Sequence, residues 1–494
     1  MRTEEKDNIV LRLTRVWLWA MLAGMPLAFH DGFFDITETK TIWFVVCAAL
    51  YLLGRGVCRL QFGPSGRRRK PTAAGYCAAA FCFITLLASV GSGFLRDSLI
   101  GAQGRWQGAL MLWIYAALWA VLRDVPLKKE DVTLPLAVGM AASAAIAVMN
   151  HLGLDPLRFE APLGSFDRGR YISTLGNINF AGAYLALAVP AAARAALTAE
   201  TRRGRLIWGA VSALGLWAAM AVRSESAVLG VGAGLAVLPF TLRDRAQLSR
   251  WCLLPGAAAV LMQLYRIPAA LCGAGFSSLT SLLLRPWCAA ALTLSGMAFL
   301  PAARRTTDAK RFHRGYGLTL AALTAAAAVA LVLLNTAFAD VPLSGAEAWL
   351  RFSDEWGTDR VGVWKHCLAL RESFGPWERI LGGGCGILAR LDSQDRIFPD
   401  AVLDAAHCEY LQILLNWGTA GLAAYLGWLV LSVREGFRNG GALAGALLPG
   451  LAGYAVQAAV NIAQAPGIML FFVLLAAQRS KIRENSPDFQ HIVG

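Results

Sequence analysis

Apolar segments close to the length of a membrane-spanning helix recur along this chain of 494 residues from one end to the other. A spanning helix needs about 20 apolar residues, because the hydrocarbon core of a bilayer is about 30 Å thick. Only 16% of the residues are charged, whereas soluble domains carry about a quarter. The sequence therefore predicts an all-α, polytopic membrane protein with about twelve to fourteen transmembrane helices, forming a single integral membrane domain over residues 1–494.

The helix boundaries are clear except where prolines interrupt residues 251–300 and where the first and last segments are short. The predicted spans lie near residues 16–30, 41–58, 72–92, 107–122, 132–152, 180–198, 206–222, 226–242, 251–270, 280–300, 315–338, 409–432, 442–460 and 465–478.

The net charge of +14 is distributed in short basic clusters between the apolar segments. These clusters fall in every second connection, which is the pattern of cytoplasmic loops in membrane proteins. They lie at residues 67–70, 128–129, 202–205, 243–250, 304–305 and 479–483. The arrangement predicts that both termini are cytoplasmic, and it argues against a nucleic-acid partner, which would need a continuous basic surface.

The longest polar stretch between apolar segments covers residues 339–408 and is predicted to be a large extracytoplasmic loop. Up to Asp404 it has seven Lys or Arg against eleven Asp or Glu, unlike the basic connections. Its first half predicts amphipathic helices on the outer membrane surface, since apolar residues recur there at helical spacing. These residues are Trp349, Phe352, Trp356, Val361, Trp364 and Leu368.

Three arginines, Arg105, Arg170 and Arg223, lie near the outer ends of predicted helices, where the positive-inside rule disfavours them. A guanidinium group binds phosphate oxygens through two parallel hydrogen bonds and keeps its charge when partly buried. The three side chains are therefore candidates for a polyanionic ligand. Contact with lipid headgroups or with neighbouring acidic residues is the alternative.

Polar side chains at two loop–helix junctions complete the candidate site. His407 is the side chain best suited to accept a proton near neutral pH, although a lone histidine is more often structural. Glu409 is a candidate to orient His407 or to attract an acceptor, although two residues apart on a helix do not share a face. Asn177 and Asn179 precede an apolar helix, where they either cap it or lend an amide to a ligand.

The ten cysteines show no CxxC pair, and no metal site or other cofactor is predicted. Cys367, Cys385 and Cys408 lie in the large loop and leave one disulfide open.

Four segments, in this order, resemble the O-antigen ligase and polymerase superfamily over about residues 90–475. They are GRWQGALMLWIYAAL, GRYISTLGNINFAGAYLALAVPA, DRVGVWKHCLAL followed by GGGCGIL, and AHCEYLQILLNWGTAGLAAYL. The resemblance implies a metal-independent, inverting glycosyltransferase of the GT-C architecture in the bacterial cytoplasmic membrane. Such enzymes move a glycan from a polyprenyl-diphosphate donor to a hydroxyl of a glycan, lipid or protein acceptor at an extracytoplasmic active site.

The resemblance also implies roles for individual residues. His407 matches the catalytic histidine of the family, and Arg170 matches an arginine assigned to diphosphate binding. Arg105 and Arg360 lie in family-like motifs and are further candidates for substrate binding. This chain departs from the family pattern at Cys408 and Ile178, where relatives have Asn and Pro. It also has Ser224-Glu225 where many relatives have Ser-Arg, with Arg223 displaced by two positions.

Several functions remain open at this stage. A ligase and a surface-polysaccharide polymerase share the donor and differ in the acceptor. A transporter or flippase of anionic lipid-linked glycans would need ionisable residues near helix midpoints, where Arg285 is the main candidate. A non-catalytic scaffold in glycan assembly would retain donor binding without turnover.

Overall fold

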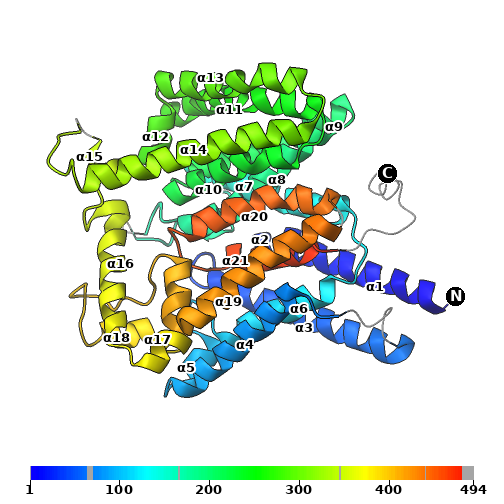
Figure 1. The fold of residues 1–494 in the computed structure, drawn as a ribbon, viewed down its shortest axis with the longest axis vertical. Coiled ribbons are helices and arrows are strands. Elements are labelled where there is room, and N and C mark those ends of the chain that lie inside the picture. Colours follow the sequence, from blue (N-terminus) through cyan, green and yellow to red (C-terminus); the bar gives the residue numbers. More distant parts are fainter. Residues whose placement is uncertain (1, 64–69, 165–166, 344–345, 440, 481–494) are drawn as a thin grey trace.

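The computed structural model describes residues 2–63, 70–164, 167–343, 346–439 and 441–480, and most of them are helical (Figure 1). Within the described residues, ten helices are long and apolar enough to cross a membrane, so the prediction of an all-α, multi-pass membrane protein is confirmed. These spans are α1 (Arg2–Trp19) with η1 (Ala20–Gly24) and α2 (Met25–Leu27), α3 (Ile36–Phe62), α4 (Ala73–Gly91), α7 (Lys129–His151), α8 (Ile178–Thr198), α9 (Arg202–Ala221), α11 (Arg245–Leu271), α13 (Pro286–Arg305), α14 (Ala309–Asn335) and α19 (Glu409–Asn439).

Four shorter apolar helices coincide with the remaining predicted spans. They are α6 (Ala109–Leu122), α10 (Glu225–Val237) with η2 (Leu238–Thr241), α20 (Ala442–Ala458) and α21 (Gly467–Ala477). Further short elements connect the spans: α5 (Leu95–Ile100), α12 (Ser278–Leu283), α15 (Glu347–Leu350), α16 (Trp356–Glu372), α17 (Pro376–Leu381), α18 (Ile387–Asp392), β1 (Tyr171–Ile172) and β2 (Gly176–Asn177).

Several boundaries differ from the prediction, and two of these differences change the interpretation. The first helix begins at Arg2 rather than near residue 16, because the polar N-terminal residues extend the helix beyond its apolar part. The predicted span at 280–300 is broken, since α12 ends before Arg285 and α13 begins with Pro286. Arg285 is thus an exposed N-cap residue rather than a charge in the middle of a helix.

The apolar stripe predicted in the large loop is correct at Val361 and wrong at Leu368. Gly357, Thr358 and Asp359 have positive φ angles, so the regular part of α16 starts only at Arg360. Of the predicted stripe, Leu368 is 49% exposed. The side chains that α16 buries are Val361, which belongs to the predicted stripe, and Val363, Cys367 and Leu370, which do not. In Figure 1, α16 runs across the ends of the long helices rather than alongside them.

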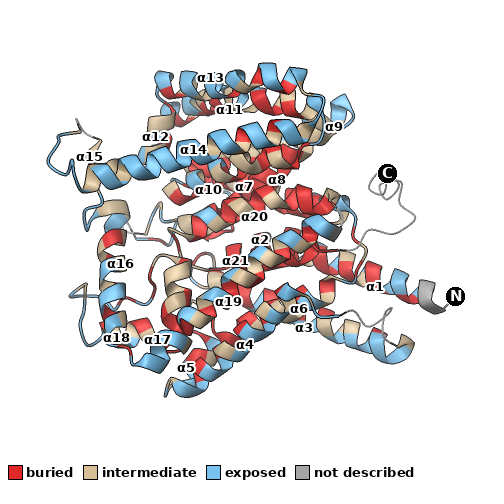
Figure 2. Cartoon of the chain, viewed as in Figure 1, coloured by how far each residue is buried: buried red, intermediate tan, exposed pale blue. Residues whose placement is uncertain are grey.

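Helix α8 lies at the centre of the bundle, and most of its residues are buried (Figure 2). Small residues allow its neighbours to approach closely. A side chain on Gly182 would meet Ala227 of α10, and one on Gly450 of α20 would meet the carbonyl of Leu187. By contrast, α14 has an almost wholly exposed apolar surface, as expected for a helix that contacts lipid.

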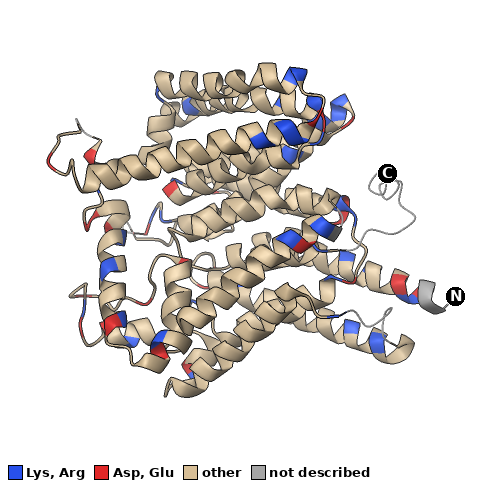
Figure 3. Cartoon of the chain, viewed as in Figure 1, with Lys and Arg blue, Asp and Glu red and all other residues tan. Residues whose placement is uncertain are grey.

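The two ends of the bundle differ in charge. Lys and Arg gather at the right-hand ends of the helices in Figure 3, away from α15–α18. The end that carries α15–α18, called the loop end below, has acidic and basic residues mixed.

Candidate functional site

An ion pair joins two distant segments at the loop end. Arg105, in the link between α5 and α6, donates from Nε and Nη2 to Asp404 Oδ2 and Oδ1 at 2.9 and 2.8 Å. The side chains are 28% and 40% exposed, so solvent reaches both. Although burial raises the pKa of Asp404, the hydrogen bond and charge of Arg105 outweigh it and leave the pKa lowered. The bidentate geometry fixes the backbone three residues before His407.

His407 is partly buried and has a backbone φ of 50°. Burial is the largest cause that lowers its pKa from 6.5 to about 4. The positive charges of Arg360 and Arg105 lower the pKa further, while the charge of Asp404 opposes them. The imidazole is therefore neutral at physiological pH, so a lone pair is free to accept a proton.

Arg360, at the start of the regular part of α16, is the second cation near His407. One guanidinium nitrogen donates to the carbonyl of Gly357, which the left-handed residues 357–359 turn towards the side chain. Burial lowers the pKa of Arg360, and the charge of Glu225 at the start of α10 opposes this. Its buried Nε has no hydrogen-bond partner among the described residues. This leaves one buried donor of the guanidinium group unsatisfied.

The hairpin before α8 carries the other predicted arginines. β1 and β2 pair Tyr171 with Asn177, and Arg170 immediately before them is exposed. Arg223, also exposed, donates from Nη2 to the carbonyl of Gly169 at 2.9 Å. Arg170 and Arg223 therefore both lie at the base of this hairpin. Glu225 follows Arg223 by two residues, and its negative charge raises the pKa of Arg360. The hairpin and α16 are therefore coupled electrostatically.

The two predicted asparagines have different partners. Asn177 caps α8, because its Oδ1 accepts the backbone N–H of Asn179 at 2.9 Å. This is the capping interaction that the sequence allowed. The Oδ1 of Asn179 accepts from Ser224 Oγ at 2.7 Å and so joins α8 to the residue before α10.

Glu409 does not face the loop. Its side chain is buried, and its two carboxylate oxygens accept from Tyr425 at 2.5 Å and from Tyr454 at 2.8 Å. Tyr425 lies on α19 and Tyr454 on α20, so Glu409 joins these helices directly behind His407. This geometry favours a structural role for Glu409 rather than the predicted contact with His407 or a substrate.

A polar face on α20 and the residues after it was missed by the sequence analysis. Tyr454 and Gln457 lie on α20, and Asn461 and Gln464 continue the spacing of three or four residues in the non-helical chain after Ala458. Each points to a different part of the site: Tyr454 to Glu409, Gln457 and Asn461 to Asn179 and Ser226, and Gln464 to the carbonyl of Gly104. The spacing 454, 457, 461, 464 within an apolar stretch is the signal that would have identified it.

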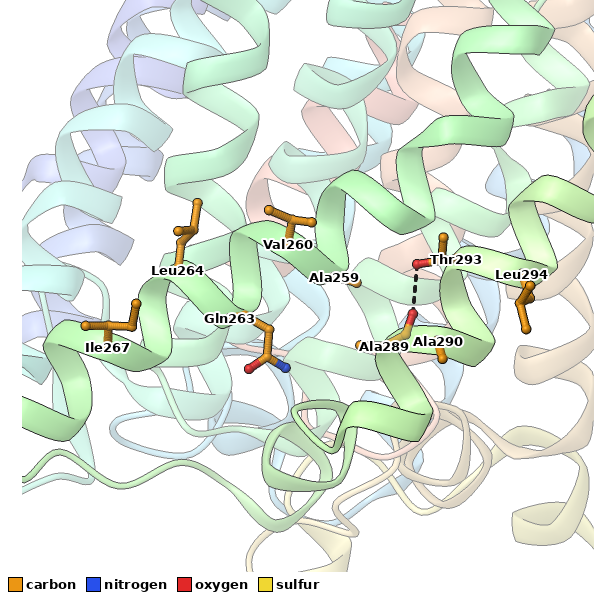
Figure 4. A pocket seen from close by; sticks show the side chains of 9 residues that line it. All are labelled: Ala259, Val260, Gln263, Leu264, Ile267, Ala289, Ala290, Thr293 and Leu294. Carbon is orange, nitrogen blue, oxygen red and sulfur yellow. Dashed lines mark hydrogen bonds between the residues drawn. The ribbon is translucent and has the colours of Figure 1, made fainter.

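An apolar cavity of about 390 Å³ lies among α9–α14. Val228 and Val231 of α10 line it, so it begins about one helical turn from Glu225. A second, more open apolar cavity of about 570 Å³ lies between α11 and α13 (Figure 4). There Thr293 donates to the carbonyl of Ala289, and Gln263 is the other polar side chain of the lining. Both cavities suit hydrocarbon better than polar ligands.

Within the described residues, no group of three or more His, Cys, Asp or Glu side chains is close enough to hold a metal ion. The ten cysteines are all unpaired thiols. Comparison with models of known protein families and with curated proteins gives no match for this chain.

Proposed function

We propose that this protein is a glycosyltransferase that moves a glycan from a polyprenyl-diphosphate donor to an acceptor hydroxyl. The observation that carries the proposal is a partly buried histidine, His407, whose pKa is lowered by burial and by the charges of Arg360 and Arg105, at the loop end of a membrane-embedded bundle. The charge distribution supports an orientation with the loop end outside the cytoplasmic membrane and both termini inside.

In this proposal the arginines neutralise the leaving group. Displacement of a diphosphate from a sugar carbon becomes easier when positive charges and hydrogen-bond donors meet its oxygens. Arg360 offers its unpartnered Nε, and Arg170 and Arg223 add charge at the hairpin. The acceptor oxygen forms a bond to the anomeric carbon as the bond from that carbon to the diphosphate oxygen breaks. The acceptor proton passes to His407, and the configuration at the anomeric carbon is inverted.

The low pKa of His407 fits a site that is completed by its substrate. Two of its causes are the charges of Arg360 and Arg105. A bound diphosphate carries negative charge and would offset both, which raises the pKa of His407 towards the operating pH. The histidine would then become a better base only when the donor is present.

The apolar cavity of about 390 Å³ offers a place for the first part of the polyprenyl chain. Because α10 lines it and also begins at Glu225 beside Arg360, head group and chain would bind along the same helix. The transporter alternative has less support, since Arg285 is an exposed N-cap residue between α12 and α13. Ligase and polymerase activity remain equally compatible with this site.

The test is a transfer assay in membranes that contain the host's polyprenyl-diphosphate-linked glycan. Wild-type protein should transfer the glycan, and His407→Ala should not, while both reach the membrane in equal amounts. The matched control is His313→Ala, since His313 lies near the start of α14 and contacts the carbonyl of Leu242, away from the loop end. Equal transfer by wild type and His407→Ala would refute the role of His407, and product length would separate polymerase from ligase.

A further inference from the structure

A buried histidine–aspartate pair lies behind the segment that carries His407. His366 of α16 contacts Asp392, the last residue of α18, with 3.0 Å between Nε2 and Oδ1. The side chains are 13% and 0% exposed. Neither residue contributes to the proposed chemistry. A buried carboxylate nevertheless has a large desolvation cost and requires partners, so its contacts show what the pair holds in place.

Asp392 accepts two further hydrogen bonds from the chain leading to the site. The backbone N–H of Leu403 donates to Oδ2 at 2.7 Å, and that of Ile397 donates to Oδ1 at 3.3 Å. Hydrogen bonds to a carboxylate are stronger than those between neutral groups. Leu403 immediately precedes Asp404, the partner of Arg105. The carboxylate of Asp392 thus holds one end of the short segment that leads to His407.

The other contacts of residues 403–407, called the histidine segment here, show why that end matters. The Asp404–Arg105 ion pair is partly exposed, and such pairs contribute little stability. The backbone N–H of Ala406 donates to Gln412 Oε1 at 2.8 Å. Of these anchors, the contact to Asp392 is the one formed by a fully buried charge.

An apolar cluster surrounds the pair and seals it from solvent. Leu403 and Ala406 of the histidine segment pack there with Val363 and Cys367 of α16 and with Leu388 of α18. Cys367 is fully buried. If the histidine segment moved away, this thiol would lose part of its cover.

We propose that Asp392, held by His366, is a positioning residue that fixes the histidine segment against α16 and so places His407. Neither residue touches the substrate in this assignment, which rests on the proposed function for its effect on transfer. The position of the segment can be measured without any assumption about function. The two parts of the proposal are therefore separable.

The first experiment measures thiol labelling of the full-length protein, with a maleimide reagent and peptide mapping to separate Cys367 from the other cysteines. His366→Leu removes the N–H donor and retains an apolar side chain, whereas His366→Gln places an amide N–H near the position of Nε2. Labelling of Cys367 should be on the order of tenfold faster in His366→Leu, as expected when a buried charged group loses one hydrogen bond. His366→Gln should restore slow labelling.

Two further variants complete the set. Asp392→Asn keeps the shape but replaces one acceptor oxygen by a donor, so it should also expose Cys367, and it substitutes for His366→Leu if that variant does not reach the membrane. His30→Leu removes an exposed histidine that also pairs with an aspartate and should leave labelling unchanged. Labelling at the wild-type rate in both His366→Leu and Asp392→Asn would overturn the proposal. Equally fast labelling in His366→Gln would also overturn it, because loss of the hydrogen bond would not be the cause.

The second experiment is transfer by the same variants. His366→Leu should lower kcat on the order of tenfold with little change in the KM for the donor, because Arg360 and the hairpin arginines are untouched. His366→Gln should recover most of kcat. If Cys367 is labelled faster in His366→Leu and Asp392→Asn but the wild type shows no transferase activity, the proposed function is refuted. The positioning role of Asp392 is supported in that case.

Discussion

Replacing Arg360 by glutamine should make transfer more sensitive to acid. The charge of Arg360 is the second largest cause, after burial, of the low pKa of His407. A histidine that acts as base is active only when neutral, so kcat/KM falls as the pH drops through the pKa of the free enzyme. Loss of a positive charge favours the protonated form and raises that pKa. The acid limb of the variant should therefore lie at higher pH than that of the wild type.

The expected loss of activity at low pH is bounded by two values of the pKa of His407, its lowered value and its ordinary value. With the pKa at about 4, His407 is about 97% neutral at pH 5.5, so the wild type should lose almost no activity there. If the pKa returned to its ordinary 6.5, the neutral fraction at pH 5.5 would be about 9%. The activity of the variant at pH 5.5 should fall between these limits, since burial remains, and its loss at that pH cannot exceed about tenfold.

The assay is kcat/KM for the lipid-linked donor from pH 5 to 8, with each protein normalised to its own value at pH 8. Normalisation removes the general loss of donor binding that Arg360→Gln also causes. The control is Asp404→Asn, because the charge of Asp404 raises the pKa of His407 and its removal should keep the acid limb at low pH. Coincident normalised profiles for wild type and Arg360→Gln would refute the electrostatic coupling of Arg360 to His407.

Three further outcomes are expected. In the wild type, the acid limb of kcat should lie at higher pH than that of kcat/KM, because bound diphosphate raises the pKa of His407; equal limbs would contradict this. Tyr454→Phe should lower the free energy of unfolding by about 1–3 kcal/mol, since the buried Glu409 loses a hydrogen bond, and thermal unfolding in detergent measures this loss. The double variant Tyr454→Phe, Glu409→Gln should lower the free energy of unfolding by less than the sum of the two single effects. Asn179→Ala should raise the donor KM more than it lowers kcat, because Ser224 beside the hairpin arginines loses its acceptor; an unchanged KM would contradict it.

The membrane architecture was predictable because spanning helices depend on length and hydropathy, which a sequence displays directly. The predicted segments correspond to the ten long and four short apolar helices. The capping role of Asn177 was also accessible, since it depends only on neighbours in the chain. The position of the helix break at Arg285 could not be predicted, because a proline can begin, kink or end a helix. The prolines indicated only that the boundaries in this region are uncertain.

The partners of the site residues could not be predicted, since they join segments far apart in sequence. Nothing local indicates that Arg105 pairs with Asp404 or that Glu409 points to Tyr454. The stripe around Leu368 was misplaced because left-handed residues at 357–359 delay the regular helix, and periodicity assumes an unbroken one. The polar face of α20 was visible as spacing, but its meaning required the positions of three other helices.

The left-handed backbone at His407 has a consequence for how such a chain can change over time. A φ of 50° is unfavourable for a side chain with a Cβ atom by about 1–2 kcal/mol, and glycine or asparagine adopts it more readily. Either residue at this position would relieve this backbone cost. Selection on the backbone alone would therefore favour glycine or asparagine here, and a histidine would persist only where the imidazole itself is selected.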